Sequence, residues 1–490
     1  MNSGPSPVPR SCALGAALLA CLAGNALAQV DAARATEPPT RFDGHRVVRA
    51  ELRTARDFLV VSALTDDIWT ESIRRAGPID FRVTPEQFAA LGQTRLRFEV
   101  LIEDVQRAID DETAEIRALA AADGPGWYDS YHNYTDNKAY CQGLAAAYPG
   151  LAQYFVAGLS VQGREIFGLR ITGPGPTASR PATLWWGGQH AREWVNVPVT
   201  EYCAERLLTD YATDARVRYL VDNMEFLFIP IMNPDGYDYT WTNNRLWRKN
   251  RRQITSSCFG VDLNRNWGHQ WGGQGASTQC SNDTYRGPSA FSEAETQVMR
   301  DLIIANPRIV TTMDLHSYGQ LIMSPWGYTA ALPEPPAMAA EFQARDDAMA
   351  AAIFAVHGRV YEAGPVHTTI YPASGVSVDW AWGARGIKGF TIELRAGDPN
   401  GFILAPEQII PTSEENFAAF LALSEAYTPC YANCDGSTAA PVLNVSDFGC
   451  FLGRYAAGEA YANCDGSTVA PVLNVQDFGC FLQRYAAGCP

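Results

Sequence analysis

Short apolar segments alternate with longer helical segments between residues 127 and 428, and this pattern constrains the fold more than any other feature of the chain. Strand-like segments lie at 183–186, 225–231, 309–315 and 389–394, and helix-like segments lie at 197–209, 292–306 and 336–356. Buried strands mixed with helices are typical of an α/β domain. We therefore predict a mixed central β-sheet flanked by helices, with functional side chains gathered at the strand ends.

Length and charge narrow the class of the protein. The 490 residues predict about three domains. Hydrophobic residues make up 47% and charged residues 19%, which is a globular composition. Lys and Arg number 38 against 53 Asp and Glu. This balance argues against nucleic acid or an anionic membrane as the main partner, because both require a basic face.

Residues 1–28 have the composition of a secretory signal peptide. Arg10 is their one charged residue, residues 12–22 are apolar, and residues 26–28 read Ala-Leu-Ala, a small-x-small cleavage site. An alternative interpretation of residues 18–21 is a lipoprotein processing site that leaves a lipid on Cys21. No later segment reaches the roughly 18 apolar residues of a membrane span. We expect an exported chain, secreted to the outside or the periplasm, or lipid-anchored through Cys21.

Residues 44–110 combine strand and helix signals in an α+β pattern. Alternating apolar residues at 48–52, 79–83 and 98–102 predict strands, and residues 55–64 have helical spacing. Residues 84–87, Thr-Pro-Glu-Gln, form a capping box with proline at the first helical position. We predict a four-stranded antiparallel sandwich with two helices. The charged, Ala-rich stretch 111–126 is then a connector that ends in Gly-Pro-Gly and is suited to proteolysis.

An internal repeat with a period of 30 residues fills residues 430–490. Residues 431–438 recur at 461–468, and residues 447–452 recur at 477–482. Each copy is too small to bury a core alone, so we expect the two copies to pack together. Six of the 12 cysteines lie in this Cys-rich repeat tail.

Export places the cysteines in an oxidising environment, where disulfide pairing is the default. Cys258 and Cys280 lie 22 residues apart in a Ser-, Gly- and Asn-rich region and are good candidates for a bridge. Cys141 and Cys203 are either a second pair or two buried thiols, and the sequence leaves both open.

A possible metal site is built on residues that follow two strands. His190 and Glu193 come just after the apolar segment 183–186, and His316 follows the segment 309–315. A histidine of this kind is, taken alone, more often a surface or hydrogen-bonded side chain. Two histidines and one glutamate together would leave zinc a fourth position for water, which is the catalytic and not the structural arrangement.

The remaining parts of a hydrolytic site are also present. Glu393 ends an apolar strand, where a carboxylate is costly for structure but makes sense as a general base. Residues 244–249 carry cations in an aromatic setting. Asn264 and Arg265 offer an amide beside a guanidinium, which suits a carboxylate. Each basic residue taken singly is better explained as a solvated surface charge.

Taken together, these motifs resemble the zinc carboxypeptidases of the pancreatic carboxypeptidase A/B type, for which a His₂Glu zinc site is known. The resemblance covers residues 127–428 in register. Its motifs lie at 131–134, 187–194, 233–237, 244–249, 260–267, 316–318, 369–371, 377–380 and 390–395. Residues 81–83 and 101–105 of the front segment look like the inhibitory propeptide of this family.

The resemblance implies catalytic roles for five residues. His190, Glu193 and His316 bind one Zn²⁺. Glu393 is the general base and then carries the proton to the leaving amine. Arg248 stabilises the oxyanion beside the metal.

It also implies how substrate is held. Asn264, Arg265 and Tyr371 bind the terminal carboxylate of a peptide, and Arg192 and Tyr318 line the next subsite inward. Two structural matches accompany these roles: Asp262 corresponds to the carboxylate that orients a zinc histidine, and Cys258 with Cys280 corresponds to the disulfide of the family.

The pocket for the C-terminal side chain is predicted to be apolar. In the family, a carboxylate at the position of Val378 selects Lys or Arg. Here the residue is valine, and the matching neighbours Met323, Val366 and Thr391 are uncharged. We expect a preference for apolar or aromatic C-terminal residues, and we expect the adjacent Asp379 to serve the structure.

The tail resembles dockerin-like anchoring modules in a cysteine-containing form. Its oxygen ligands of calcium-loop type are Asn433, Asp435, Asp447, Asn463, Asp465 and Asp477. Tyr431 and Tyr461 stand where the first Asp of such a loop is expected, so a disulfide-stapled repeat without Ca²⁺ is the alternative. The resemblance implies a surface or scaffold partner.

We therefore predict a secreted, monomeric zinc carboxypeptidase, made as a zymogen, that acts on peptides with a free C-terminus. One alternative is an amidase or deacylase, but Asn264, Arg265 and Tyr371 suit a terminal carboxylate. Another is a non-catalytic adhesion protein, which would need neither Glu393 nor Arg248.

Overall fold

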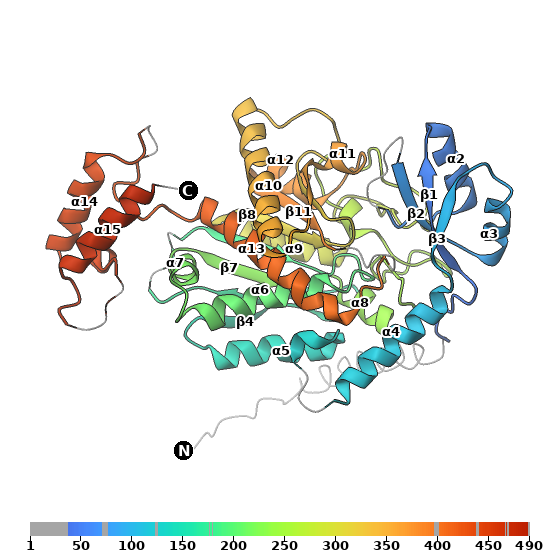
Figure 1. Cartoon of the computed structure of the whole chain (residues 1–490), viewed down its shortest axis with the longest axis horizontal. Helices are drawn as coiled ribbons and strands as arrows, with labels where there is room; N and C mark the ends of the chain where they lie inside the picture. Colours follow the sequence, from blue (N-terminus) through green and yellow to red (C-terminus); the bar gives the residue numbers. More distant parts are fainter. Residues whose placement is uncertain are drawn as a thin grey trace, which may run out of the picture.

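The computed structural model describes residues 38–70, 77–122, 126–175, 177–178, 180–395, 401–437, 441–465, 467 and 470–488. The predicted signal peptide and Cys21 lie outside these residues. No helix in the described ranges is long and apolar enough to cross a membrane. Figure 1 shows the front unit, here residues 44–110, and the tail, residues 430–490, at opposite ends of the long axis, with the large sheet between them.

The front unit is built on a three-stranded antiparallel sheet of order β2-β1-β3. Its strands are β1 (Arg46–Leu52), β2 (Gly77–Val83) and β3 (Phe98–Ile102), and its helices are α2 (Ala55–Leu64) and α3 (Pro85–Leu91). The capping box is present: Thr84 accepts from the backbone N–H of Gln87, whose side chain accepts from the N–H of Thr84. This box fixes where α3 begins.

The prediction of a four-stranded sandwich is wrong for the described residues. In place of a fourth strand, Ile68 makes a single antiparallel bridge to Phe81. The next residue, Trp69, is fully buried in a cluster that includes Phe402 of the large unit. Its backbone N–H still donates to the carbonyl of Asp80 on β2 at 2.8 Å, so this stretch adds one bridge to the sheet while its indole contacts the large unit.

Helix α4 (Val105–Ala120) runs from the end of the front unit into the connector, and its first turn is capped by Asp104. Its buried Glu112 side chain forms a two-pronged ion pair with Arg245 of the large unit, with both nitrogen–oxygen distances below 3 Å: 2.6 and 2.9 Å. Predicted cleavage in this connector would thus act on a segment that is held against the large unit by a buried pair.

The large unit contains an eight-stranded mixed sheet of order β10-β9-β11-β8-β6-β7-β5-β4. Its strands are β4 (Ala152–Leu159), β5 (Glu165–Ile171), β6 (Ala182–Trp186), β7 (Glu225–Ile229), β8 (Ile309–His316), β9 (Leu321–Ser324), β10 (Glu362–Pro365) and β11 (Lys388–Glu393). The central strands β7, β6, β8 and β11 are parallel to one another. Their carboxyl ends therefore meet at one edge of the sheet, where ligands bind in such folds.

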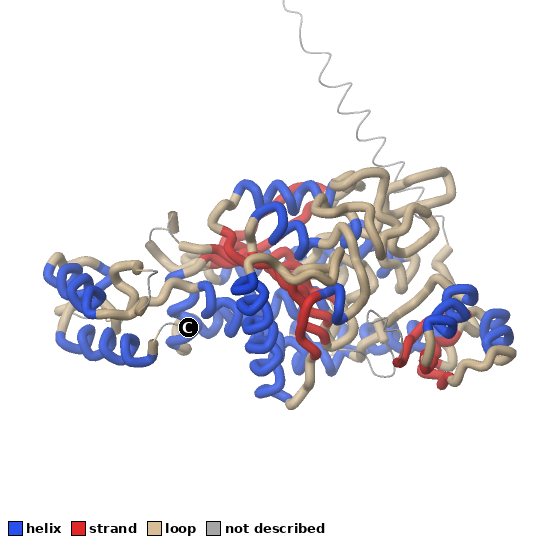
Figure 2. The backbone as a smooth tube through the Cα atoms, turned by 90° about the horizontal axis from the view of Figure 1, so that it is seen from above, coloured by secondary structure: helices blue, strands red, loops and turns tan. Residues whose placement is uncertain are grey.

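Helices cover both faces of this sheet (Figure 2). They are α5 (Tyr134–Ala147), α6 (Asn196–Asp210), α7 (Ala215–Asn223), α8 (Pro234–Thr242), α9 (Ala294–Ala305), α10 (Pro336–His357), α11 (Val366–Thr369), α12 (Ser377–Arg385) and α13 (Ile409–Tyr427), with 3₁₀ turns at η1 (Trp127–Asp129), η2 (Leu263–Arg265) and η3 (Pro406–Gln408). Successive residues of a strand point to opposite faces of the sheet. Trp185 therefore belongs to the core that contains residues of α5, α6, α10 and α13, and Trp186 belongs to the core that contains residues of α9 and α12. The predicted α/β fold with a mixed central sheet is confirmed.

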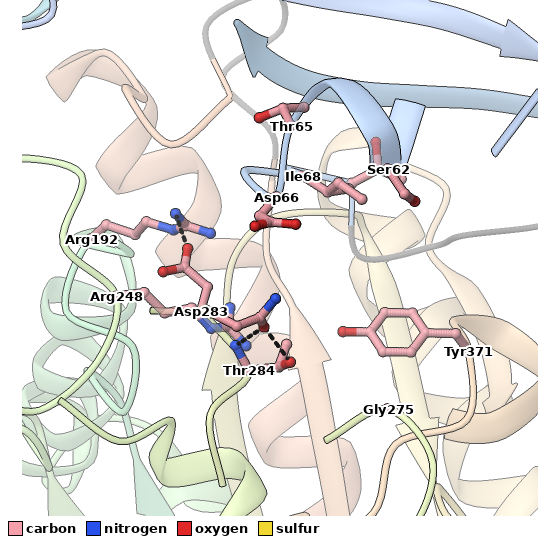
Figure 3. Close-up of a pocket in the computed structure, with 12 residues that line it drawn as sticks. Ser62, Thr65, Asp66, Ile68, Arg192, Arg248, Gly275, Asp283, Thr284 and Tyr371 are labelled. Atoms are coloured by element: carbon pink, nitrogen blue, oxygen red, sulfur yellow. Dashed lines mark hydrogen bonds and ion pairs between the residues drawn. The ribbon is translucent and has the colours of Figure 1, made fainter. Parts of the chain in front are cut away.

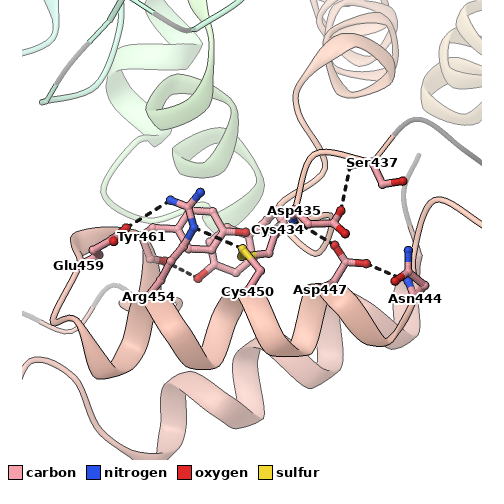
Figure 4. The surroundings of a disulfide bond; sticks show 10 residues. Cys434, Asp435, Ser437, Asn444, Asp447, Cys450, Arg454, Glu459 and Tyr461 are labelled. Atoms are coloured by element: carbon pink, nitrogen blue, oxygen red, sulfur yellow. Dashed lines mark hydrogen bonds and ion pairs between the residues drawn. A yellow bond between two sulfur atoms is a disulfide. The ribbon is translucent and has the colours of Figure 1, made fainter.

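The two tail repeats pack against each other. Helices α14 (Val445–Ala456) and α15 (Val475–Ala487) stack Phe451 on Phe481 with ring centroids 4.2 Å apart, and η4 (Ala460–Ala462) lies between them. Each repeat carries an internal disulfide, Cys434–Cys450 and Cys464–Cys480. Figure 4 shows the first of these bridges beside Asp435 and Asp447.

Candidate active site

Two histidines and a glutamate meet at the carboxyl ends of β6 and β8. His190 Nδ1 lies 2.9 Å from Glu193 Oε1, and His316 Nδ1 lies 3.0 Å from His190 Nδ1 and 3.2 Å from Glu193 Oε2. All three side chains are at most 3% exposed. They form the one group of at least three His, Cys, Asp or Glu side chains in the described chain that could hold a metal ion.

The spacing and the tautomers of this group fit zinc. Ligand atoms at about 2.0–2.1 Å from a tetrahedral Zn²⁺ stand about 3.3 Å apart, close to the observed separations. Each imidazole turns its Nε2 to a buried carboxylate: His190 Nε2 lies 3.0 Å from Asp262 Oδ1, and His316 Nε2 lies 3.0 Å from Asp314 Oδ2. Each Nε2 can therefore donate its proton to a carboxylate, which directs the Nδ1 atoms of both rings toward Glu193 and toward a cation bound between them.

The charges of the cluster also favour a cation at its centre. Burial opposes a charge on His316, but the carboxylates of Asp314 and Glu193 outweigh it and raise the pKa of His316 well above its ordinary value. Burial likewise opposes the Glu193 carboxylate, yet His190 and His316 lower its pKa. Backbone support comes from Ser317, whose N–H donates to Glu193 Oε2 at 3.1 Å.

Glu393 and Arg248 complete the surroundings of the cluster. Glu393 is the last residue of β11, pairs in register with His316, and is 4% exposed. Arg248 Nη2 donates to Asp262 Oδ2 at 3.1 Å, and Arg248 Nη1 lies 3.7 Å from Glu193 Oε1. Burial opposes the Asp262 carboxylate, but Arg248 and His190 lower its pKa well below the ordinary value. Asp262 thus fixes a histidine and a guanidinium at once.

The predicted carboxylate-binding residues lie at the same edge but not as three free groups. Arg265 Nη2 donates to Tyr371 Oη at 2.8 Å, so these two side chains face each other. Asn264 instead accepts the backbone N–H of Ser377 at 3.0 Å and turns its amide nitrogen toward His316 Nε2 at 3.2 Å. The side chain of Asn264 therefore contacts His316 and also lines the pocket.

A narrow pocket lies next to the metal cluster and is lined on its other side by apolar residues. His190, His316, Arg248 and Glu393 line its mouth together with Asn264 and Arg265, and the wall is formed by Met323, Val366, Ile370, Ala373, Val376, Val378 and Thr391. Asp379 does not enter the pocket. Its carboxylate accepts the backbone N–H groups of Gly327 and Tyr328 at 2.8 and 3.0 Å, and burial raises its pKa to about 7.

The front unit covers the approach to this site. Arg192 lies 3.5 Å from Asp67 and 3.2 Å from Asp283, and Tyr318 donates to Asp80 at 3.3 Å. A cavity of about 300 Å³ remains between the two units. Figure 3 shows Arg192 and Arg248 at the left of this cavity, Tyr371 at the right, and Thr65, Asp66 and Ile68 of the front unit in its upper part.

Sequence reasoning missed two residues of this region. Asp314 supports His316, and its sequence signal was its position two residues earlier on the same strand. Arg245 is 6% exposed, stacks on Trp194 at 3.7 Å and pairs with Glu112, and its sequence signal was its place in the basic segment 244–249.

The four cysteines between the front unit and the tail are now assigned. Cys258 and Cys280 form a disulfide. Cys141 and Cys203 are two free, buried thiols, which decides the alternative that the sequence left open. Burial raises the pKa of both, so neither is a reactive thiolate at neutral pH.

The predicted calcium ligands serve mainly as local hydrogen-bond acceptors. Asp447 accepts the N–H groups of Asp435 and Asn444, and Asp477 accepts those of Asp465 and Asn474. Asn433 and Asn463 donate to the carbonyls of Ser437 and Ser467. Calcium binding therefore stays a prediction.

A buried His₂Glu group at the strand ends of a mixed sheet, faced by a carboxylate and a guanidinium, defines a metal-dependent hydrolase. The family model of zinc carboxypeptidases matches residues 137–419, and that of the carboxypeptidase activation peptide matches residues 48–112. The chain belongs to the zinc carboxypeptidase family, whose members hydrolyse peptides and use one Zn²⁺, and it carries an activation peptide.

Individual relatives agree with this assignment. The chain is 37% identical over 420 residues to metallocarboxypeptidase A of Trichophyton rubrum, covering 83% of this chain and 98% of the relative. It is 34% identical to zinc carboxypeptidase A 1 of Drosophila melanogaster, covering 82% and 96%. The crystal structure of carboxypeptidase A from Helicoverpa armigera superposes with a TM-score of 0.71 at 30% identity, covering 79% of this chain and 99% of that one.

Proposed function

We propose that this chain is an exported carboxypeptidase that, once its front unit is removed, cleaves the last residue from peptides and prefers an apolar or aromatic one. The observation that carries this proposal is the pairing of Glu393 with His316 at the mouth of a pocket whose deep wall has no charged side chain. A base beside the metal cluster suits hydrolysis, and the wall suits an apolar side chain.

His190, Glu193 and His316 would hold the zinc ion of the family. When bound, zinc polarises the scissile carbonyl and acidifies water. Glu393 takes the proton from the attacking water and delivers it to the nitrogen of the leaving residue. Both transfers balance, because the base returns to its carboxylate form at the end of the reaction.

Arg248 stabilises the oxygen that becomes negative during attack. Its guanidinium is held by Asp262 Oδ2 at 3.1 Å, so it does not have to reorient when the charge develops. The same carboxylate supports His190, which couples the placement of the oxyanion clamp to that of a metal ligand.

Arg265, with Tyr371 and the amide of Asn264, binds the terminal carboxylate of the substrate. Arg265 also donates from Nε to the carbonyl of Gly275 at 2.8 Å, which fixes the direction of its planar fork. A substrate without a terminal carboxylate would leave this buried guanidinium without a counter-charge, and such substrates should be poor.

The side-chain pocket sets the preference. Val378 and Met323 are 1% exposed and Val366 is 3% exposed, so a bound cation there would lose its water without gaining a partner. An apolar side chain in the same place gains by burial.

The front unit blocks the inward subsite until it is cut away. Arg192 and Tyr318, which would contact the substrate upstream of the scissile bond, are engaged by Asp67 and Asp80. Cleavage in residues 111–126 would release the front unit, and Arg117 is one candidate position for a trypsin-like protease.

The remaining elements of the proposal rest on sequence. The signal peptide exports the chain, with lipidation at Cys21 as the alternative. The tail docks to a surface or scaffold partner, with Ca²⁺ as a candidate ligand, and the enzyme acts as a monomer.

One assay tests the proposed function. The full chain is trimmed by trypsin and given blocked dipeptides that differ only at the C-terminal residue, with and without a chelator. We expect chelator-sensitive release of C-terminal Phe or Leu. Hydrolysis of the C-terminal amide of the same dipeptides at an equal rate would instead favour an amidase.

A further inference from the structure

We propose that Asp314 is a positioning residue that orients His316 for metal binding and ties this ligand to the base of the side-chain pocket. This inference rests on the proposed use of His190, Glu193 and His316 as the zinc ligands. Asp314 lies two residues before His316 on β8, so the two side chains project from the same face of the strand. Its Oδ2 atom lies 3.0 Å from His316 Nε2, and both side chains are at most 1% exposed.

Asp314 is the one acceptor among the polar groups around His316 Nε2. The amide nitrogens of Asn264 and Gln189 lie 3.2 and 3.4 Å from Nε2. The backbone N–H of Ser377 fixes the orientation of the first amide, because it donates to Asn264 Oδ1.

The indole N–H of Trp267 fixes the second amide in the same way, by donating to Gln189 Oε1. Both nearby amides therefore present donors to the imidazole, and neither can accept its proton. Asp314 alone can accept the Nε2 proton, which leaves the lone pair on Nδ1 directed at Glu193 and His190.

The same carboxylate oxygen joins two further parts of the site. Gln189 Nε2 donates to Asp314 Oδ2 at 2.9 Å, and Ser377 Oγ donates to it at 2.7 Å. Gln189 precedes the ligand His190, and Ser377 precedes Val378 at the base of the pocket. Asp314 thus lies where the two histidine-bearing segments and helix α12 meet.

The two carboxylates that contact the histidines, Asp262 and Asp314, differ in the number of cationic side chains beside them. Asp262 is paired with Arg248 as well as with His190. Asp314 has His316 as its one ionic partner among the described residues, and its other donors are neutral. The charge of Asp314 is therefore available to stabilise a cation held by His316. Removing this charge should lower the affinity for zinc.

The test is zinc release from the full chain, which needs neither trimming nor catalysis. Loss of a group that supports a metal ligand typically costs about 10–100-fold in metal affinity. Asp314→Ala should release zinc to a chelator about 10–100-fold faster than the parent. Asp314→Asn, which keeps the shape but not the charge, should fall between the two.

Thr312→Val is the matched control. Thr312 lies on the same face of β8, two residues before Asp314, and its buried hydroxyl has no hydrogen-bond partner. Its zinc release should equal that of the parent. If Thr312→Val released zinc as fast as the Asp314 variants, the effect would come from a general disturbance of β8, and the assignment to Asp314 would be overturned.

Thermal unfolding separates positioning from general support of the core. We expect the zinc-induced rise in Tm to shrink in Asp314→Asn, while the Tm of the zinc-free form stays at or above that of the parent. Parent-like zinc release in Asp314→Asn and Asp314→Ala would overturn the proposal. An equal fall of Tm in the zinc-free and zinc-loaded forms would also overturn it. A parent chain that binds no zinc would instead refute the proposed function itself.

Discussion

Glu393 and His316 are register partners at the ends of the neighbouring parallel strands β11 and β8. This pairing places a buried carboxylate beside a histidine of the metal cluster through backbone hydrogen bonding alone. The sheet, and not a mobile loop, therefore sets their separation, as expected for a base that must be ready before substrate arrives.

Replacing this base should abolish turnover while the metal stays bound. Glu393→Gln is near-isosteric but cannot accept the proton of the attacking water, so we expect a loss of at least about 100-fold in kcat. Zinc content and single-turnover rates of the trimmed enzyme measure the two effects separately. A near-normal rate at full zinc content would contradict the role given to Glu393.

The contact between Asp67 and Arg192 should hold the front unit over the site. The side chain of Arg192 is 2% exposed and that of Asp67 is 17% exposed, so Asp67→Ala should cost about 1 kcal/mol of this interface. We expect about a fivefold rise in the basal activity of the untrimmed chain, measured on a blocked dipeptide.

Two controls accompany that measurement. Asp66 lines the same cavity but is exposed, and Asp66→Ala should leave basal activity as in the parent. Trimming removes the changed residue, so all trimmed enzymes should be equally active. If the trimmed and untrimmed parent were equally active, the front unit would be a folding aid and not an inhibitor.

The sequence predicted those features that depend on local pattern. His190, Glu193, His316 and Glu393 were found because each follows an apolar strand, and strand ends converge in an α/β sheet. The capping box at Thr84 was found because it spans four residues.

The features that were missed depend on contacts between distant segments. Trp69, which follows the single bridge at Ile68, packs on Phe402, more than 300 residues away in sequence. The pairing of Arg245 with Glu112 joins segments that share no local signal. Whether Cys141 and Cys203 pair depends on how α5 and α6 are placed, which no spacing rule specifies.

We expect the free energy of unfolding to fall as pH rises, because α6 contains a buried acid. Glu201 accepts hydrogen bonds from Trp127 Nε1 and the thiol of Cys141, and burial raises its pKa to about 8. A folded-state pKa above the unfolded value means that the folded chain binds more protons, so the stabilisation is complete below about pH 4.5 and is lost as pH rises toward 8.

Glu201→Gln isolates this effect, because the amide stays neutral and can still accept from Trp127. At pH 8.5 the variant should be more stable than the parent by at least about 1 kcal/mol, and the difference should shrink at pH 5. Denaturant unfolding of the full chain at both pH values measures it. A difference that does not change with pH would show that Glu201 has an ordinary pKa.

The wall of the side-chain pocket should decide which residue is removed. Val378 lies in the first turn of α12 and lines the pocket with Met323 and Val366, so a C-terminal Lys or Arg would be desolvated there without a partner. We expect C-terminal Phe or Leu to be cleaved at least about 10-fold better in kcat/KM, which corresponds to about 1.4 kcal/mol. Val378→Asp should narrow or reverse this ratio by pairing the cation, whereas Val378→Asn, of similar shape but without charge, should slow cleavage of Phe without favouring Lys. Comparable rates on Phe and Lys substrates in the parent enzyme would show that Val378 does not set the selectivity and would indicate a dual-specificity carboxypeptidase.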